Sequence, residues 1–191
     1  MIRLLDIIAS TIGLILLSPL FLLIAIWIKL DSPGSVFYKQ TRVGQYGRDF
    51  KLFKFRSMRT DADKAGLLTV GGSDSRITRA GLFIRKYKLD ELPQLINVLL
   101  GEMSLVGPRP EVRKYTDMYT EDQKLVLNVR PGITDWASIE FRNENEILGK
   151  SDNPEKTYIE QIMPIKIELN NRFIQHPSLG HYFKIIFKTI F

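Results

Sequence analysis

An uncharged, strongly apolar stretch from Ile7 to Ile28 limits the folds open to this chain more than any other feature. At about 22 residues, it is long enough for a helix to cross the hydrocarbon core of a bilayer. It is too long for the apolar part of a typical secretion signal, little charge precedes it and no small-residue cleavage site follows, so we expect it to be retained. The sequence therefore predicts a membrane segment over residues 1–30.

Ser18 and Pro19 lie near the middle of this stretch and predict a marked bend. Proline removes one helix hydrogen bond and clashes with the preceding turn, whereas serine can bond to a freed carbonyl. Basic residues flank both ends, Arg3 before and Lys29 after, so the positive-inside rule does not orient the segment. A re-entrant helix that returns to the same membrane face satisfies both flanks, but many spanning helices also contain a kinking proline. The residues alone leave both topologies open.

Composition limits the chemistry that the rest of the chain can carry. The 191 residues suffice for one modest domain beside the membrane segment. Cysteine is absent, which excludes disulfides, cysteine nucleophiles and thiolate metal sites. The two histidines, His176 and His181, both lie near the C-terminus, so a histidine-based zinc site or triad is not expected. Catalysis, if present, must depend on carboxylates and cations.

A formal net charge of +6 is compatible with three kinds of anionic partner: nucleic acid, a membrane surface or a phosphorylated substrate. We expect no nucleic acid, because the chain has no recognised DNA- or RNA-binding motif and its cations gather near one acidic pair.

That acidic pair, Asp90 and Glu91, precedes apolar residues at helical spacing that Gly101 can terminate. Pro93 is tolerated only in the first turn of a helix, so the pair lies in or just before that turn. Free N–H groups and the helix dipole favour charged carboxylates there, and also favour a bound phosphate. An ionised aspartate beside an anion site is a candidate nucleophile, although an isolated Asp-Glu pair is more often a helix cap.

Cations on both sides of the pair favour phosphoryl transfer. Upstream lie Arg76, Arg79, Arg85, Lys86 and Lys88. Downstream, Arg109 is held between Pro108 and Pro110, so it loses little freedom when its planar donors bind a phosphate. Arginines offset the repulsion between a carboxylate nucleophile and a phosphate. A glycosidase is a poor alternative, because its two carboxyl groups must stand about 5–10 Å apart around a sugar.

The other segments predict an α+β chain that is mostly helical. Residues 35–58 have weak alternation, β-prone aromatics and central glycines, which is typical of a β-hairpin, here beside the membrane. The polar stretch from Thr60 to Ser75 predicts a surface loop or short helix and a candidate lid over a substrate. Residues 76–87 predict a helix whose inward side chains are Leu82, Phe83 and Tyr87.

The segments predicted after residue 111 are an amphipathic helix, a polar linker and two further helices, over residues 112–129, 140–153, 158–173 and 181–191. The last helix has Lys184 and Lys188 along one edge of an apolar body. This pattern is typical of a helix in the headgroup region, although a core helix with lysines at its edge has the same pattern. We therefore divide the chain into a membrane helix, a catalytic domain and C-terminal amphipathic interfacial helices, over residues 1–30, 31–145 and 146–191.

Three motifs carry a resemblance to a known family. They are LDELPQLINVLLGEMSLVGPRPE at residues 89–111, KFRSM at 54–58 and RPGIT at 130–134. Together they resemble the bacterial sugar transferases known as monotopic phosphoglycosyl transferases, over nearly the whole chain. The resemblance implies transfer of a sugar-1-phosphate from a UDP-sugar to a polyprenyl phosphate such as undecaprenyl phosphate. UMP is released, and lipid-linked glycan, exopolysaccharide or glycoconjugate synthesis begins.

The same resemblance implies roles for individual residues. Asp90 attacks the β-phosphorus and forms a phosphosugar-aspartate intermediate, Glu91 assists as its partner, and Mg²⁺ lies at Asp90 and the diphosphate. The residues expected to bind phosphate or nucleotide are Lys54, Arg85, Pro108, Arg109, Pro110 and Arg130.

The resemblance also implies topology and location. It favours a re-entrant helix broken at Ser18 and Pro19, with a compact catalytic domain on the cytoplasmic face of the bacterial inner membrane. One position departs from the family, since Asp135 stands where glycine is usual. Asp135 either contacts the sugar or alters a turn, and we favour the turn.

Two other functions remain open from the residues: a membrane-tethered hydrolase of nucleotide-diphosphate sugars that uses the same aspartate, and a basic membrane adaptor without catalysis. The sequence also leaves open the sugar, the polyprenol length and whether the chain forms a homodimer.

Overall fold

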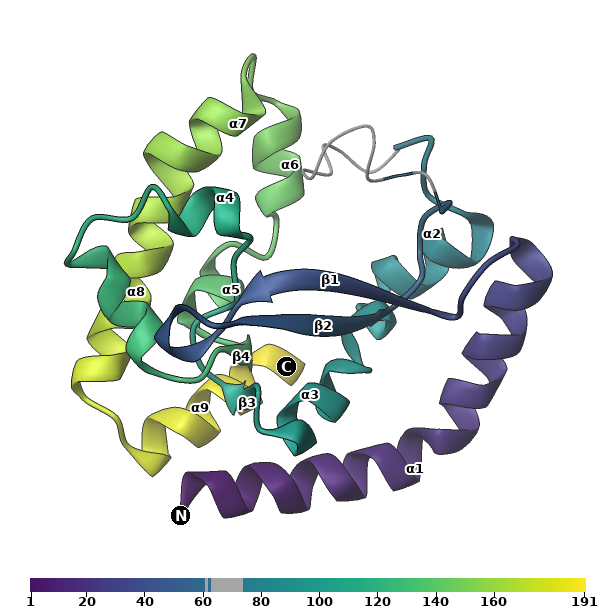
Figure 1. The fold of residues 1–191 in the computed structure, drawn as a ribbon, viewed down its shortest axis with the longest axis horizontal. Helices are drawn as coiled ribbons and strands as arrows, with labels where there is room; N and C mark the ends of the chain where they lie inside the picture. Colours follow the sequence, from purple (N-terminus) through teal and green to yellow (C-terminus); the bar gives the residue numbers. More distant parts are fainter. Residues whose placement is uncertain (61, 63–73) are drawn as a thin grey trace.

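A bent N-terminal helix and a two-stranded hairpin frame the molecule, with shorter helices packed around them (Figure 1). The structure is a computed structural model that describes residues 1–60, 62 and 74–191. The loop predicted from Thr60 to Ser75, with its candidate lid, falls mostly outside these residues. The described chain is mostly helical and has a small antiparallel sheet, as the sequence predicts.

Helix α1 (Ile2–Asp31) contains Pro19, and Figure 1 shows its two halves meeting at a marked bend. The hydroxyl of Ser18 donates a hydrogen bond to the Ile15 carbonyl, 2.8 Å away. Because proline has no N–H to donate, the helix loses a backbone bond here, and the serine satisfies a carbonyl in the preceding turn. The bend expected from the Ser-Pro pair is therefore present.

The first half of α1 is fastened to the body of the molecule by one buried carboxylate. Asp6 accepts hydrogen bonds from the Ser104 hydroxyl at 2.9 Å, the Leu105 backbone N–H at 3.0 Å and the Tyr182 hydroxyl. A buried carboxylate is costly unless donors surround it, and these donors come from two distant parts of the chain. Asp6 thus fixes the apolar helix to a β-strand and to the C-terminal helix.

The second half of α1 packs against the hairpin and α2 (Arg79–Lys86). The buried residues of this cluster are Ile24, Ile28, Phe55, Ala80 and Ile84. At the helix end, the Arg56 guanidinium donates to the carbonyls of Ser32, at 2.7 Å, and Pro33. Both halves of α1 therefore pack against the rest of the described structure.

The opposite face of α1 is apolar and exposed. Its large exposed side chains include Leu4, Ile8, Ile12, Ile15, Leu16, Leu22, Leu23, Ile26, Trp27 and Leu30. Among the described residues, α1 is the one helix long and apolar enough to cross a membrane. A soluble protein rarely leaves so large an apolar face without a partner.

Strands β1 (Phe37–Val43) and β2 (Asp49–Phe55) form the predicted antiparallel hairpin. Helix α3 (Gln94–Leu100) lies against β2 through the fully buried amide of Asn97. This amide donates to the Lys51 carbonyl at 2.8 Å and accepts from the Phe53 N–H at 2.9 Å. These hydrogen bonds fix the position of α3, and of the turn that precedes it, against β2.

A short parallel pair, β3 (Ser104–Val106) and β4 (Gly132–Thr134), was not predicted. Its backbones approach closely just beyond β3, where a Cβ added to Gly107 would lie 2.6 Å from the Arg130 carbonyl oxygen. Only glycine permits this approach. The pair places the two proline-containing motifs, at residues 106–111 and 130–134, side by side.

Helix α2 contradicts one expectation about inward side chains. Phe83 and Tyr87 are 45% and 55% exposed, and Leu82 is exposed as well. The buried face instead carries Ala80, Gly81 and Ile84, and a Cβ added to Gly81 would lie 1.9 Å from the Ser57 carbonyl oxygen. The Phe83 ring lies 5.3 Å from the Trp27 ring of α1, so the exposed aromatics extend the apolar face of α1.

The segment expected as one amphipathic helix over residues 112–129 is divided into α4 (Arg113–Thr116) and a 3₁₀ segment, η4 (Gln123–Asn128). Thr120 and Gln123 exchange hydrogen bonds between side chains and backbone N–H groups, at 3.0 and 3.3 Å. This reciprocal capping begins a new helical segment, so the single helix was wrong.

The C-terminal region contains more helix than predicted. Its elements are α5 (Trp136–Glu140), α6 (Glu144–Gly149), α7 (Pro154–Thr157), the π-helical η5 (Tyr158–Ile162), α8 (Met163–Gln175) and α9 (Leu179–Ile190). The two last predicted helices are confirmed. The polar linker at 140–153 was wrong in part, because Leu148, which is 1% exposed, anchors α6 in a core cluster with Val112 and Tyr158.

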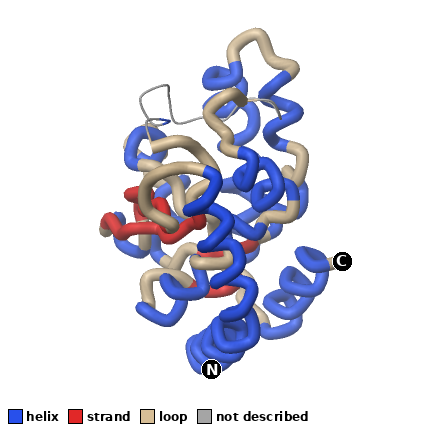
Figure 2. The backbone as a smooth tube through the Cα atoms, turned by 90° about the vertical axis from the view of Figure 1, so that its right-hand side faces the viewer, coloured by secondary structure: helices blue, strands red, loops and turns tan. Residues whose placement is uncertain are grey.

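Helix α9 has one buried and one exposed face. Tyr182 and Ile185 are buried beside Val106, whereas Phe183 and Phe187 are exposed. Figure 2 shows both chain termini in the lower half of the molecule, and the Tyr182 hydroxyl of α9 donates to Asp6 near the start of α1. Because buried clusters join residues across the three predicted segments, packing does not mark their boundaries, and the division at residues 30 and 145 stays a prediction.

Replacing Asp6 with alanine tests the anchoring of α1. The change leaves the Ser104, Leu105 and Tyr182 donors without their acceptor, so we expect the free energy of unfolding to fall by about 2–4 kcal/mol. Thermal unfolding of detergent-solubilised protein, followed by circular dichroism, measures the loss. Asp152→Ala, at an exposed position, is the control, and equal stability of the two variants would contradict the anchoring role.

Candidate active site

One cavity of about 980 Å³ runs between the hairpin, the turn before α3 and helices α5, α6, α8 and α9. The predicted site residues that line it are Lys54, Arg85, Asp90, Glu91 and Arg109. Pro108 and Pro110 are buried next to it. Arg130 does not line this cavity and instead donates a hydrogen bond from Nε to the Gly101 carbonyl, at 2.9 Å.

Asp90 and Glu91 lie in a 3₁₀ turn, η3 (Leu89–Glu91), immediately before α3. Lys88 begins the turn with a positive φ of 56°, and Pro93 precedes the first residue of α3. Both acidic residues therefore lie just before the helix, as predicted. The turn buries Asp90, which is 7% exposed, at the cavity wall.

Glu91 is bound by two cations from different parts of the chain. Arg109 grips both of its oxygens, with Nη1 at 3.0 Å from Oε2 and Nη2 on Oε1. Lys54 from β2 donates to Oε1 at 3.1 Å. Burial alone would raise the pKa of Glu91, but Arg109 and Lys54 together hold that pKa well below its ordinary value.

Asp90 has a different environment from its neighbour. Burial raises its pKa above the ordinary aspartate value, and the negative charge of Glu91 adds to this effect, whereas Lys54 opposes it. Lys54, Arg85 and Lys88 all lie near enough to lower the pKa of Asp90, as the sequence led us to expect of its surroundings. The direct ion pairs of Lys54 and Arg109, however, are with Glu91. Asp90 is thus a buried and more basic carboxylate at the wall of a cation-lined cavity.

Hydrogen bonds to the backbone of Arg109 fix its position, in addition to the contacts of its side chain with Glu91. Its N–H donates to Asp135 Oδ2 at 3.0 Å, and the neighbouring Gly107 N–H donates to the Thr134 carbonyl at 3.0 Å. Asp135 also accepts from the Ser138 N–H at 2.6 Å, which caps α5. Asp135 is 1% exposed, does not line the cavity, and uses both carboxylate oxygens for hydrogen bonds within the protein, which supports the favoured role in the turn.

Arg42, a residue not predicted for the site, supports the same turn from β1. It donates from Nη1 to the Pro110 carbonyl at 2.9 Å and from Nη2 to Gln40 Oε1 at 2.8 Å. Its Nη1 also lies 3.6 Å from Glu111 Oε2. On sequence alone it resembles an ordinary strand charge, and the available signal was that Gln40 and Arg42 share one face of a strand.

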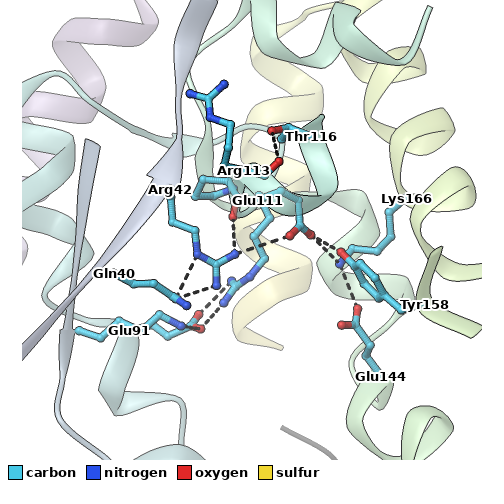
Figure 3. Close-up of polar contacts among 12 residues, drawn as sticks. Gln40, Arg42, Glu91, Glu111, Arg113, Thr116, Glu144, Tyr158 and Lys166 are labelled. Carbon is cyan, nitrogen blue, oxygen red and sulfur yellow. Dashed lines mark hydrogen bonds and ion pairs between the residues drawn. The ribbon is translucent and has the colours of Figure 1, made fainter. Parts of the chain in front are cut away.

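A second polar cluster continues from Arg42 across the cavity wall (Figure 3). The Tyr158 hydroxyl donates to Glu111, and the Lys166 ammonium lies 3.9 Å from Glu111 Oε1 and 3.0 Å from Glu144 Oε2. Tyr158, Lys166 and Glu144 come from η5, α8 and α6, and all three line the cavity together with Glu111. Sequence reasoning assigned this region to a linker and surface helices and so missed them.

The described residues contain no group of three or more His, Cys, Asp or Glu side chains placed to hold a metal. Both Glu91 oxygens are bound by cations, which leaves Asp90 as the free carboxylate of the pair. The predicted Mg²⁺ site at Asp90 therefore stays a prediction.

Comparison with known proteins identifies the family. The family model of the bacterial sugar transferases matches residues 1–191. This chain belongs to the bacterial sugar transferase family.

Named relatives match nearly the whole of this chain. A UDP-N-acetylgalactosamine-undecaprenyl-phosphate N-acetylgalactosaminephosphotransferase of Aeromonas hydrophila is 42% identical over 97% of the chain. A UDP-glucose:undecaprenyl-phosphate glucose-1-phosphate transferase of Escherichia coli K12 is 40% identical over 97%. The chain spans 41% and 38% of these two relatives. It spans 81% of the exopolysaccharide production protein ExoY of Rhizobium meliloti, which is 35% identical.

The lowered pKa of Glu91 predicts how stability depends on pH. A carboxylate with a lowered pKa in the folded state contributes stability above its unfolded pKa and loses it as the pH falls through the folded value. We therefore expect this sugar transferase to lose stability below about pH 4.5, the ordinary value for glutamate, more steeply than a Glu91→Gln variant does.

Urea unfolding between pH 3 and pH 7 measures this dependence. Glu155→Gln is the matched control, because Glu155 forms an exposed ion pair with Lys114. If Glu91→Gln and Glu155→Gln have the same pH dependence, the folded protein does not depend on the Glu91 ion pairs in this way.

Proposed function

We propose that this chain transfers a sugar-1-phosphate from a UDP-sugar to undecaprenyl phosphate and releases UMP. The observation that carries the proposal is Asp90, buried at the cavity wall beside a glutamate whose charge is already balanced by Arg109 and Lys54. The names of the Aeromonas and Escherichia relatives point to the same reaction. The product would begin the synthesis of a lipid-linked glycan, as in exopolysaccharide or glycoconjugate assembly.

The proposed reaction has two displacements at one phosphorus atom. An Asp90 carboxylate oxygen attacks the β-phosphorus of the UDP-sugar, the bond to the bridging oxygen breaks, and UMP leaves with that oxygen. A phosphate oxygen of undecaprenyl phosphate then attacks the same phosphorus and releases the Asp90 carboxylate. Burial suits this role, because bond formation removes the negative charge that burial disfavours and a more basic carboxylate is a better nucleophile.

The cations have a separate task in this mechanism. Arg109 and Lys54 neutralise Glu91 and lie where the diphosphate would meet Asp90, so they reduce the repulsion between two anions. Arg85 lies on the same cavity wall and lowers the pKa of Asp90 slightly against the larger effect of burial. We assign Arg130 an indirect role, since it holds the Gly101 end of α3.

The residues present are compatible with Mg²⁺ as a cofactor. Magnesium in proteins is usually held by one or two carboxylates together with substrate phosphates and water. Asp90 would supply that carboxylate, and the ion would neutralise charge on the diphosphate. This assignment needs no further protein ligand.

We propose further that α1 is re-entrant and that the protein lies on the cytoplasmic face of the bacterial inner membrane. Both halves of α1 pack on one body, which supports a helix that enters and leaves the same side. Its exposed apolar face continues into the exposed side of α2. Helix α9 packs beside the start of α1 through Tyr182 and Asp6, and its exposed phenylalanines suit an interfacial helix.

Asp90→Asn tests the nucleophile. Because an amide cannot form the covalent bond to phosphorus, we expect UMP release from UDP-sugars to fall by about 10⁴-fold or more, with the fold and membrane binding retained. Release is measured with and without undecaprenyl phosphate, and Asp117→Asn is the control at an exposed position. Substantial UMP release by Asp90→Asn would exclude this aspartate, whereas sustained wild-type turnover without a lipid acceptor would indicate a hydrolase.

Cysteine labelling tests the topology, and the absence of native cysteine makes each introduced thiol unique. One cysteine is inserted after Met1 and another replaces Ser35, which is exposed beyond the end of α1. A re-entrant helix predicts that a membrane-impermeant maleimide labels both from the cytoplasmic side, as it labels Asp152→Cys. Labelling of the two sites from opposite sides would establish a spanning helix.

A further inference from the structure

The cavity is larger than a diphosphate needs. Its volume of about 980 Å³ is near the top of the ~300–1,000 Å³ range of small-molecule sites. The cations around Glu91 occupy one wall, and the cluster of Glu111, Tyr158, Lys166 and Glu144 occupies another (Figure 3). A ligand whose diphosphate lies at Asp90 therefore extends past a second polar wall.

Two side chains of this second wall have hydrogen-bonding capacity that the described protein does not use. The Lys166 ammonium has three donors, and among the described residues Glu144 is its one hydrogen-bond acceptor. Glu144 uses Oε2 for that bond, which leaves Oε1 free on the described part of the chain. Both side chains are largely shielded, with 12% and 26% exposure.

A third group points to the same conclusion. Ser138 is one of the residues that line the cavity, and its hydroxyl is shielded from solvent and has no hydrogen-bond partner among the residues that the structure describes. A shielded donor or acceptor without a partner costs about 1–3 kcal/mol, and a bound ligand that supplies the partner removes this cost. By contrast, the donors of Arg42 and Arg109 are directed to protein acceptors.

The chemistry of this wall suits hydroxyl groups. A carboxylate accepts from one hydroxyl of a vicinal diol while an ammonium group donates to its neighbour, and neither interaction needs a charged ligand. Lys166 and Glu144 lie 3.0 Å apart, and their mutual charges cancel, so the wall does not attract a second phosphate. The Lys166–Glu144 salt bridge contributes little net free energy to folding, because the cost of removing both charges from water offsets their attraction.

We propose that Lys166 and Glu144 form a subsite that binds a vicinal diol of the UDP-sugar donor. This inference rests on the proposed function. The diol belongs either to the ribose of the nucleotide or to the hexose, since both flank the diphosphate.

The position of the subsite relative to the reaction centre is fixed by contacts. Lys166 lies 3.9 Å from Glu111, Glu111 lies 3.6 Å from Arg42, and Arg42 bonds the Pro110 carbonyl next to Arg109. Binding of the diol would thus set how the donor lies against Asp90. Rigid placement of this kind is what allows a site to distinguish one hydroxyl configuration from another.

Direct binding to the full-length protein tests the subsite. Glu144→Gln and Lys166→Met are compared with the control Glu168→Gln. Glu168 lies on α8, as Lys166 does, and its exposed carboxylate pairs with Arg172. Isothermal titration with UDP-glucose and UDP-N-acetylgalactosamine is expected to give dissociation constants about 10- to 100-fold higher for both site variants. The control should remain within about twofold of wild type.

Two ligand series identify the source of the diol. If it is the ribose, the affinity for UMP falls by the same factor, and 2′-deoxy-UMP binds the wild type weakly. If it is the hexose, UMP affinity is unchanged, and the preference between UDP-glucose and its C4 epimer UDP-galactose shrinks in the variants. Either pattern supports a diol subsite.

Unchanged affinities for every ligand in folded variants would overturn the inference, as would an equal loss in Glu168→Gln. If Lys166→Met fails to fold, the isosteric Glu144→Gln decides the matter, with folding checked by circular dichroism. Binding does not require turnover, so a wild type that binds UDP-sugar through this wall but releases no UMP would refute the proposed function alone. A wild type that binds neither UDP-sugar nor UMP would refute both.

Discussion

The carboxylate of Glu91 is bound by Arg109 and Lys54, and this ion-pair cluster joins three segments that are distant in sequence: the hairpin, the turn before α3 and the turn after β3. Removing Glu91 would leave two shielded cations without their bound counter-ion. The cluster also gives the two acidic neighbours different pKa values. Cations lower the pKa of Glu91, whereas burial raises the pKa of Asp90. Two adjacent residues in one turn can therefore perform different tasks.

Secondary contacts extend outward from this cluster. Asp135 holds the backbone of Arg109 and caps α5, and Arg42 holds the next carbonyl from β1. Asp6 links the same region to the membrane helix, because its Ser104 and Leu105 partners belong to the strand that leads into the Arg109 turn. The packing of α1 and the geometry of the site are thus linked through the segment that runs from β3 to Arg109.

Local signals in the sequence predicted a good part of this arrangement. The Ser18-Pro19 bend, the hairpin, the position of Asp90 and Glu91 just before α3, and the two last helices all follow from short-range rules of periodicity and proline geometry. What failed depended on tertiary contacts: the β3–β4 pair, the buried face of α2, and Arg42 as part of the site. The sequence also could not show which cation binds which carboxylate, because only long-range packing brings Lys54, Glu91 and Arg109 together.

The bend in α1 has a practical consequence. Because the two halves of the helix supply Asp6, Ile24 and Ile28 to buried parts of the body, this helix is an integral part of the core rather than a removable tether. Deleting it to obtain a water-soluble fragment would expose the β3 strand and the inner face of α2 to solvent. The protein should therefore be prepared with α1 intact. Detergent or lipid nanodiscs can then cover the exposed apolar surface of this helix.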